Sequence, residues 1–312
     1  MKTFIQVTEI WTPTRDRSIL EFHDGWYGEH QSFGIVSRKM CFGYGEGLPG
    51  KAWAERRPVI FTDLQNAYFL RAEAARRAGL NCGVALPVFA GDFLLAVLVF
   101  FCAADEQHVG AIELWHNNAA EGAELKLEDG YFGIAESFKT VAQNTRFARG
   151  SGLPGLVWDS GMPQIMEDLG HSGLFVRSDD ARRIGINKGL GLPSPYAPGQ
   201  NYAMTFLSAL GTPIARRFEI WVPKADGSAL VFKNGECDRK PGYGTALAAV
   251  ELAPGASALS KSWTSGLPVL SEHIASESSP VGTSAKAAEL DSVVAIPLLQ
   301  DGRVTAITAM YF

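Results

Sequence analysis

One short motif recurs three times at a fixed period, and this repetition constrains the fold more than any other feature of the chain. Gly-Leu-Pro-Gly-x-x-Trp, followed by a proline and apolar residues, begins at Gly47 and again at Gly152. A third copy has lost its glycine turn but keeps the tryptophan and the proline. The three tryptophans, Trp53, Trp158 and Trp263, recur at a period of 105 residues. A long fixed period predicts three tandem copies of one unit.

The repeat period sets the expected domain boundaries at residues 1–105, 106–212 and 213–312, and a unit of this length is an ordinary domain size. The chain has 312 residues, of which 46% are hydrophobic and 20% are charged. That composition is typical of globular proteins and not of disordered ones. We therefore expect three small folded units with similar cores.

The motif itself predicts a turn, a short helix and a strand. Its glycines allow a tight turn, and Pro49 has the φ angle that suits a helix start. Arg57 precedes Pro58, which disfavours the helical conformation and ends the helix there. The apolar residues Val59 to Phe61 then predict a short buried strand. We interpret the motif tryptophans as core anchors that dock each helix on its sheet.

Each unit also begins and ends with paired strands. A Glu-apolar-Trp pattern within alternating residues opens the units, at 7–13, 111–115 and 218–223, and each is followed by a turn and a second strand. Two apolar runs joined by a tight turn close the first unit, at 82–89 and 93–102. Between motif and closing hairpin, residues 67–79 read as a helix with Gly79 as its C-cap.

These patterns together resemble the GAF family. The resemblance rests on the Gly-Leu-Pro-Gly-x-x-Trp motif with its later proline, on Asp-Leu, and on Phe-x-Arg before an apolar hairpin. It is close in the first two units and weak in the third. It implies an α+β fold, with an antiparallel sheet of about six strands and helices on its faces in each tandem unit. It also implies a small-molecule pocket between the sheet and the loops that carry the short helix.

The best ligand candidates are polar residues that recur beside aromatic ones. Asp63 and Arg71 of the first unit have counterparts in Asp168 and Arg177 of the second. An Asp, an Arg and an aromatic ring around an apolar cavity suit a small polar ligand. The full set of expected ligand-binding residues is Phe61, Asp63, Phe69, Arg71, Cys82, Asp168, Phe175 and Arg177.

A simpler interpretation of these residues stays open. Asp63 can cap the turn that follows it, and Arg71 can pair with Glu73 or Asp63 at the surface, where an ion pair contributes little stability. In the ligand-binding interpretation Arg71→Ala should weaken binding and hardly affect the fold, because a solvated arginine contributes little to stability. In the third unit the counterparts are His273 and Val281, so we expect any site to lie in the first or second unit, and we favour the first.

The four cysteines leave an enzymatic alternative open. A free-methionine-sulfoxide reductase built on one GAF unit uses cysteines near its pocket, so Cys82 or Cys41 could serve a redox enzyme. Cys102 and Cys237 complete the set, and no cysteine recurs between units. We expect no disulfide, because the spacing shows no pairing and suits a reducing compartment. Binding without catalysis is the favoured interpretation.

Composition and spacing argue against several other classes. The net charge is −5 with no dense basic stretch, which argues against nucleic-acid binding. No apolar run is long enough to span a bilayer, and we expect a cytoplasmic protein. Histidines and cysteines form no metal-ligand spacing, and Asn81-Cys82-Gly83 does not suit a covalent bilin. The Gly-x-Gly-x-x-Gly pattern from Gly45 reads as a turn, since the strand and long helix of a dinucleotide site are missing.

The expected role is therefore a cytoplasmic sensory or regulatory protein that binds a small molecule and has no output module in the chain. The links at 103–109 and 208–217 are too short for the long helices that usually flank GAF sensors. A protein partner that carries the output, and a homo-oligomer, remain open. A protein-assembly module is the third alternative, beside the binder and the cysteine enzyme.

Overall fold

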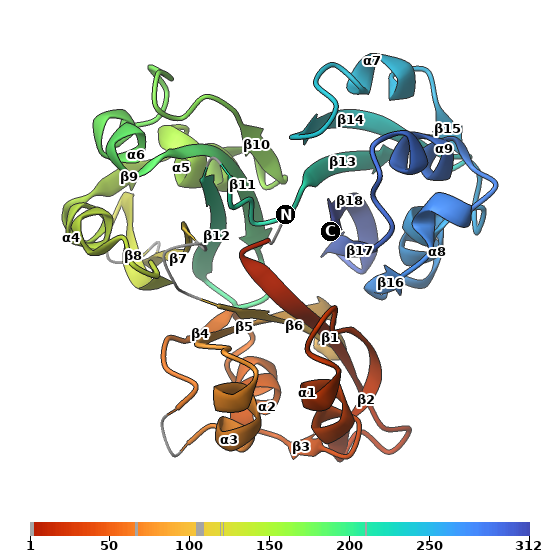
Figure 1. Cartoon of the computed structure of the whole chain (residues 1–312), viewed down its shortest axis with the longest axis horizontal. Coiled ribbons are helices and arrows are strands. Elements are labelled where there is room, and N and C mark those ends of the chain that lie inside the picture. Colours follow the sequence, from red (N-terminus) through yellow and green to blue (C-terminus); the bar gives the residue numbers. More distant parts are fainter. Residues whose placement is uncertain (1–2, 66–67, 104–108, 119, 121, 210) are drawn as a thin grey trace. The chain divides into compact units, whose positions relative to one another are not determined.

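A computed structural model describes residues 3–65, 68–103, 109–118, 120, 122–209 and 211–312. These residues form three six-stranded antiparallel sheets, one in each expected unit (Figure 1). The chain divides into two compact units, Met1–Pro87 with Val97–Ile214 and Val88–Ala96 with Ala215–Phe312. The three sheets and their helices confirm a tandem α+β fold, and the repeats are called here the first, second and third.

The first sheet has the strand order β3-β2-β1-β6-β5-β4. Its strands are β1 Ile5–Pro13, β2 Ile19–Trp26, β3 Cys41–Gly43, β4 Val59–Phe61, β5 Cys82–Ala90 and β6 Phe93–Cys102. The helices α1 Gln31–Ser37, α2 Gly47–Glu55 and α3 Ala72–Arg77 lie on one side of this sheet (Figure 1). The expected hairpins are therefore present, and β3 is an additional edge strand.

The second sheet repeats the arrangement with the order β10-β11-β12-β7-β8-β9. Its strands are β7 Gly110–Asn118, β8 Glu124–Tyr131, β9 Arg146–Ala148, β10 Gln164–Met166, β11 Ile186–Ser194 and β12 Gln200–Ala209. Its helices are α4 Glu136–Asn144, α5 Gly152–Ser160 and α6 Ser178–Ile184. The hairpin from β11 to β12 has five connecting residues, 195–199, where the first repeat has only Gly91 and Asp92.

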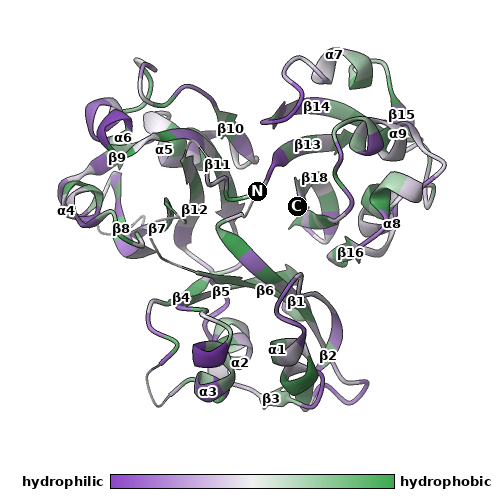
Figure 2. Ribbon diagram, in the orientation of Figure 1, coloured by the Kyte–Doolittle hydropathy of each residue, from purple (hydrophilic) through white to green (hydrophobic). Residues whose placement is uncertain are grey.

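The third sheet has the order β15-β14-β13-β18-β17-β16. The loss of the glycine turn from the third copy of the motif therefore does not change the topology. Its strands are β13 Arg217–Pro223, β14 Leu230–Cys237, β15 Glu251–Leu252, β16 Val269–Ser271, β17 Val293–Gln300 and β18 Arg303–Tyr311. Its helices are α7 Gly244–Leu247, α8 Ala258–Ser265, η1 Ile274–Ser276 and α9 Pro280–Ala287. Figure 2 shows hydrophobic residues concentrated on the strands and hydrophilic residues on many of the connecting loops.

The tryptophans at the centre of the cores are not those of the Gly-Leu-Pro-Gly motif. Trp11, Trp115 and Trp221, on the first strand of each sheet, have no exposed surface. The motif tryptophans are only half-buried, and two of them, Trp158 and Trp263, pack against the margin of their cores. The motif tryptophans therefore lie at the margin of the cores, and their role as anchors of each helix stays a prediction. The first-strand tryptophans hold the central position, because alternate residues of β1, β7 and β13 face the helices.

The helix expected over 67–79 is shorter than the sequence indicated. Helix α3 spans only Ala72–Arg77, and Tyr68 to Arg71 form turns in which side chains alternate between solvent and core. Leu174 to Arg177 do the same before α6. Most of the link at 103–109 lies outside the described residues. The alternation matters because it sends Arg71 and Arg177 inward.

Candidate functional site

Each repeat buries a carboxylate beside its central tryptophan. Glu9 and Trp11 are two residues apart on β1, so both side chains point to the helical face, and the Trp11 indole N–H donates to Glu9 Oε2 at 3.0 Å. The same bond is 3.0 Å from Trp115 to Glu113 and 2.9 Å from Trp221 to Glu219. All three carboxylates have no exposed surface. The Glu-apolar-Trp pattern thus marks a buried acid in every repeat.

The second strand of each sheet is bulged beside these two side chains. In each repeat the register between the first two strands shifts by one residue between the position that follows the Glu and the Trp. The extra residue lies on the second strand, so the bulge bends that strand, while Glu and Trp keep the regular alternation of the first. Opposite each Glu stands a glycine, Gly25, Gly130 or Gly235. A Cβ there would lie 2.9 Å or less from the side chain of Tyr27, Phe132 or Tyr243, so the glycine makes room for an aromatic side chain.

A buried arginine neutralises the acid in the first two repeats. Arg71, at the N-terminal end of α3, donates from Nη1 to Glu9 Oε1 at 2.8 Å and to Oε2 at 3.0 Å. Arg177, at the same place before α6, forms a two-pronged pair with Glu113, at 2.6 and 2.8 Å. The side chains of these ion pairs are at most 2% exposed. Each pair ties the loop before a helix to the first strand of its sheet.

Aromatic rings surround both guanidinium groups. Arg71 Cζ lies 4.9 to 5.7 Å from the ring centroids of Trp11, Phe33, Phe42, Phe69 and Phe101. Arg177 Cζ lies 4.4 to 5.8 Å from those of Trp115, Phe138, Phe147 and Phe175. Cation–π attraction is strongest where water is excluded, so these rings compensate part of the cost of burying the charge. Arg71 Nε and Nη2 have no hydrogen-bond partner among the residues that the structure describes.

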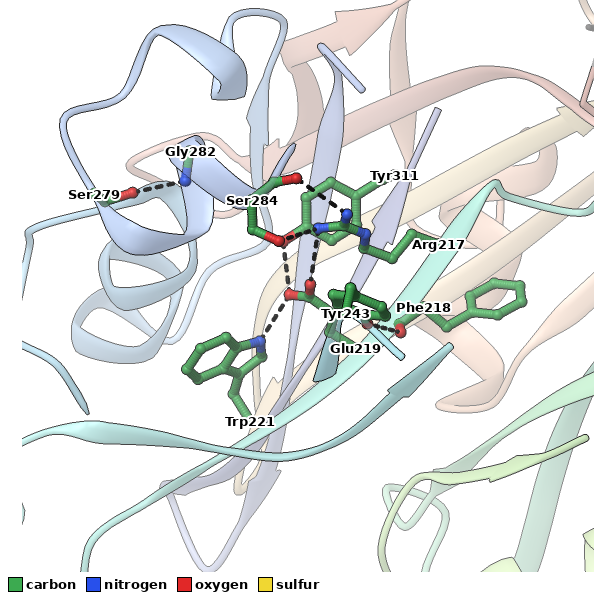
Figure 3. Close-up of polar contacts among 9 residues, drawn as sticks. All are labelled: Arg217, Phe218, Glu219, Trp221, Tyr243, Ser279, Gly282, Ser284 and Tyr311. Carbon is green, nitrogen blue, oxygen red and sulfur yellow. Dashed lines mark hydrogen bonds and ion pairs between the residues drawn. The ribbon is translucent and has the colours of Figure 1, made fainter. Parts of the chain in front are cut away.

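The third repeat keeps the ion pair but takes the arginine from a different element (Figure 3). Val281 stands where the first repeats have Arg71 and Arg177, and Arg217 of β13 supplies the guanidinium instead. Arg217 Nη1 lies 3.3 Å from Glu219 Oε1 and 3.1 Å from Ser284 Oγ of α9, and Nη2 donates to the Ser284 carbonyl at 3.2 Å. The Tyr311 hydroxyl donates to Glu219 Oε2 at 2.7 Å. Burial raises the pKa of Glu219 above its usual range, although Arg217 and the hydrogen bonds from Tyr311 and Trp221 oppose the shift.

The surface role expected for Arg71 was therefore wrong. Arg71 and Arg177 are 2% and 3% exposed, and Glu73 pairs with Arg76 and Arg77 instead. Arg71 is not a solvated side chain whose removal hardly affects the fold. Its direct contact with a ligand stays a prediction, and it would require this ion pair to open.

The glycine turn has a structural reason in the first two repeats. A Cβ at Gly50 would lie 2.1 Å from the carbonyl oxygen of Gly43, and one at Gly155 would lie 2.3 Å from that of Ala148. These distances are shorter than any real contact, so the helix can approach the edge strand only through glycine. In the third repeat Ser257 and Ser260 form a capping box at the start of α8.

Three of the expected ligand residues meet at a shallow hollow in the first repeat. Ile60, Phe61, Thr62, Asp63, Tyr68 and Phe69 line a space of about 220 Å³ along the loop from β4 towards α3. Asp63 is exposed, and its Oδ1 accepts from the Gln65 N–H at 2.8 Å, which is the turn-capping role left open above. The rings of Phe61 and Tyr68 meet edge to face, with centroids 6.0 Å apart. Tyr68 was missed from the sequence, because its helix assignment gave no reason to place it beside Phe61.

The second repeat holds the corresponding aspartate differently. Asp168 has a positive φ of 48° and its Oδ1 lies 2.8 Å from His171 Nδ1. Phe175 is buried beside Arg177, as Phe69 is beside Arg71. Asp63 and Asp168 therefore match in sequence but make different local contacts.

The cysteines differ sharply in access. Cys82, Cys102 and Cys237 are buried, whereas Cys41 is exposed, and all four are free. Burial, followed by a hydrogen bond with Cys102, raises the pKa of Cys82 well above its usual value. A redox cysteine needs access and thiolate character, so Cys82 lacks both requirements in this structure.

The described residues contain neither a metal-binding cluster nor a membrane-spanning helix. Among the residues outside the gaps, no group of three or more His, Cys, Asp and Glu side chains could hold a metal ion. No helix in the described part of the chain is both long and apolar enough to cross a membrane.

One family model matches part of the chain. This model, described as GAF domain, matches residues 6–121. Among solved structures, the A. aeolicus nlh2 GAF domain in an inactive state is 19% identical, with a TM-score of 0.27, over 33% of this chain and 60% of that one. A GAF domain/HD domain protein from Geobacter sulfurreducens is 15% identical, with a TM-score of 0.27, over 32% of this chain and 63% of that one.

A third solved structure is the free methionine-R-sulfoxide reductase from Neisseria meningitidis in complex with its substrate. It is 13% identical, with a TM-score of 0.26, over 31% of this chain and 52% of that one. The chain thus spans less than two thirds of the length of these three structures. A search of curated proteins gives no match.

Proposed function

We propose that this chain, a tandem of three GAF-like repeats whose residues 6–121 belong to the GAF domain family, is a small-molecule-binding sensory or regulatory protein. GAF domains serve as small-molecule-binding sensory and regulatory modules, and that general role is the premise. The ligand, its site and the cytoplasmic location are the parts that we add. A protein partner and a homo-oligomer stay proposals.

We place the ligand at the hollow of the first repeat. Phe61, Asp63 and Phe69, three of the residues expected from the sequence, line it together with Tyr68. This convergence of a carboxylate and aromatic rings on one small concave surface is the observation that carries the proposal. The pairing of Arg71 with Glu9 removes the positive charge expected there, so Asp63 supplies the charge among the lining residues.

The chemistry of the hollow favours a small compound with an ammonium group. Asp63 keeps Oδ2 as an acceptor beside the bond from Gln65 to Oδ1. Aromatic faces and a carboxylate together are the usual partners of an organic cation. A volume of about 220 Å³ suits a compound of a few heavy atoms.

A melting-temperature comparison tests the proposal. Choline and putrescine serve as cationic probes, and acetate serves as the anionic probe of similar size. We expect the cations to stabilise the full chain by mass action, and Asp63→Asn to abolish that effect. Asp168→Asn is the matched control, because Asp168 occupies the corresponding position but bonds His171.

Two results would overturn the assignment. Stabilisation by choline or putrescine that survives Asp63→Asn would place the site elsewhere. Stabilisation by acetate and by neither cation would show that the proposed ligand chemistry is wrong.

A further inference from the structure

A hollow in the second repeat lies on the face of the sheet that points away from the helices. It has a volume of about 520 Å³ and extends over β7, β8 and β9, with the loop at 122–123 as one wall. Leu125 of β8 and Phe147 of β9 are buried in the core on the helical face. Their neighbours along the strands, Lys126 and Arg146, therefore point to the opposite face, where they line the hollow.

Two cations stand directly opposite each other in this hollow. Lys126 and Arg146 are register partners of β8 and β9, so their Cβ atoms are about 5 Å apart. Among the residues that the structure describes, neither forms an ion pair with an acid, and Arg146 Nη1 donates to the carbonyl oxygens of Gln143 and Thr145 at 3.0 and 2.8 Å. Like charges in this position are unfavourable, so an anionic group placed between them is stabilised.

The cation pair is specific to the second repeat. The matching register partners are Glu21 and Cys41 in the first repeat, and Val231 and Glu251 in the third. Each of these pairs contains an acid and no base. The fold therefore does not require two cations at this place.

A carboxylate occupies the other end of the hollow. Glu124 lies two residues before Lys126 on the same face of β8, about 7 Å away along the strand. Its register partner is Ala148, so no long side chain from β9 competes for the carboxylate. The side chains of Glu124, Lys126 and Arg146 are exposed, and a ligand in the hollow can reach all three.

The contacts around the hollow keep these charges apart. Asn117 is 2% exposed, and its Nδ2 donates to the carbonyl oxygens of Gly122 and Glu124, which holds the wall in place. Glu128 is the next acid along this face of β8, and its Oε2 lies 3.6 Å from His116 Nδ1. The hollow thus presents two cations at one end and one carboxylate at the other.

We infer that this hollow binds a small zwitterion in which a flexible chain separates an ammonium group from a carboxylate, as in an ω-amino acid. The carboxylate pairs with Lys126 and Arg146, and the ammonium group pairs with Glu124, through charge-assisted hydrogen bonds. The separation of about 7 Å along the strand favours a chain such as that of 5-aminovalerate over an α-amino acid. This inference does not depend on the cation site of the first repeat.

A ligand-observed NMR titration of the full chain with 5-aminovalerate tests the inference. Glycine has both charges on a shorter chain, pentanoate lacks the ammonium group, and pentylamine lacks the carboxylate, so these three are the comparison probes. All titrations are made on the Asp63→Asn chain as well as on the wild type, because an ammonium group also suits the hollow of the first repeat.

The main variant combines Lys126→Val with Arg146→Glu, which copies the pair of the third repeat. Lys126→Gln, which keeps the length of the side chain more nearly, decides the matter if the double variant unfolds. Lys233→Gln is the matched control, because Lys233 is an exposed lysine on the corresponding strand β14.

In the Asp63→Asn chain we expect 5-aminovalerate to bind at least about tenfold more tightly than the three comparison probes. Lys126→Gln should weaken this binding about tenfold, and the double variant should abolish it with an unchanged melting temperature. Glu124→Gln should remove the preference over pentanoate, while Lys233→Gln should have no effect.

Three results would overturn the inference. These are unchanged affinity in Lys126→Gln, equal affinity for pentanoate, and no binding of 5-aminovalerate at about 20 mM. Since Asp63→Asn should leave this binding intact, it can fail or succeed separately from the cation site of the first repeat.

Discussion

Arg217 and Glu219 stand two residues apart on β13, and their side chains form a 3.3 Å ion pair within one strand. In the first repeat the same acid is neutralised by Arg71, which is 62 residues away in the chain. The charge balance of the core is therefore kept while the position of the arginine changes. This finding identifies the buried pair, and not the arginine at a given position, as the feature common to the repeats.

Removing one partner of the buried pair in the first repeat should destabilise the fold, and removing the second partner as well should add less than its loss alone. Glu9→Gln or Arg71→Met alone leaves one buried group without its partner and should lower the free energy of unfolding by about 3–5 kcal/mol. The double variant should lose less than the sum of the two single variants, because no charge remains uncompensated. Urea unfolding of the four proteins measures this coupling, and additive losses would contradict it.

In the third repeat, an arginine at position 281 should be able to replace the one at position 217. Arg217→Val should destabilise the third repeat by about 3–5 kcal/mol, since Glu219 is left buried and unpaired. Adding Val281→Arg restores a guanidinium at the position that Arg71 has in the first repeat, and should recover at least about 1 kcal/mol. Chemical denaturation of both variants decides the matter, and further loss in the double variant would count against it.

The two sets of tryptophans should differ in their effect on stability. Trp115→Ala removes a fully buried ring that bonds Glu113 and should cost about 3–5 kcal/mol. Trp158→Ala, at the half-buried motif position, should cost clearly less, about 1–2 kcal/mol. The comparison is made on the free energy of unfolding in urea. Equal losses would show that the motif tryptophans anchor their cores as strongly as the first-strand tryptophans do.

The thiols should react in two classes. Native protein treated briefly with iodoacetamide should gain one label, at Cys41, because Cys82, Cys102 and Cys237 are buried. Unfolded protein should gain four. Mass spectrometry of the intact chain counts the labels, and rapid native labelling of Cys82 would revive the cysteine-enzyme alternative.

Stability should fall at alkaline pH because of buried tyrosines. Burial raises the pKa of Tyr27, Tyr131, Tyr243 and Tyr311 in the folded chain. Their contribution is fully present below the unfolded pKa of about 10, and it is lost as the pH rises towards the folded values. Absorbance at 295 nm should show these four ionising only on unfolding. Ionisation of all eight tyrosines near pH 10 without unfolding would be the contrary result.

The sequence identified the repeats and the hairpins well, because both depend on local patterns. Period, alternation and turn residues are written in consecutive positions, and three of the eight expected ligand residues, Phe61, Asp63 and Phe69, line one hollow because they are near in sequence. The buried pairs depend on contacts between distant segments, such as Glu9 with Arg71. Arginine is usually a surface residue, so its place in the core could be found only from the fold. The recurrence of Glu two residues before Trp, taken with the recurring Arg, was the signal that could have revealed it.

In the third repeat both charges of the buried pair belong to one strand, and this has a consequence for how the chain can change. The segment between β16 and α9 no longer has to deliver an arginine to the core. We expect it to accept insertions and substitutions that would unfold the first two repeats, where the corresponding loops hold Arg71 and Arg177 in place. The third repeat is therefore the part of the chain in which a new loop could be grafted at the least risk to the fold.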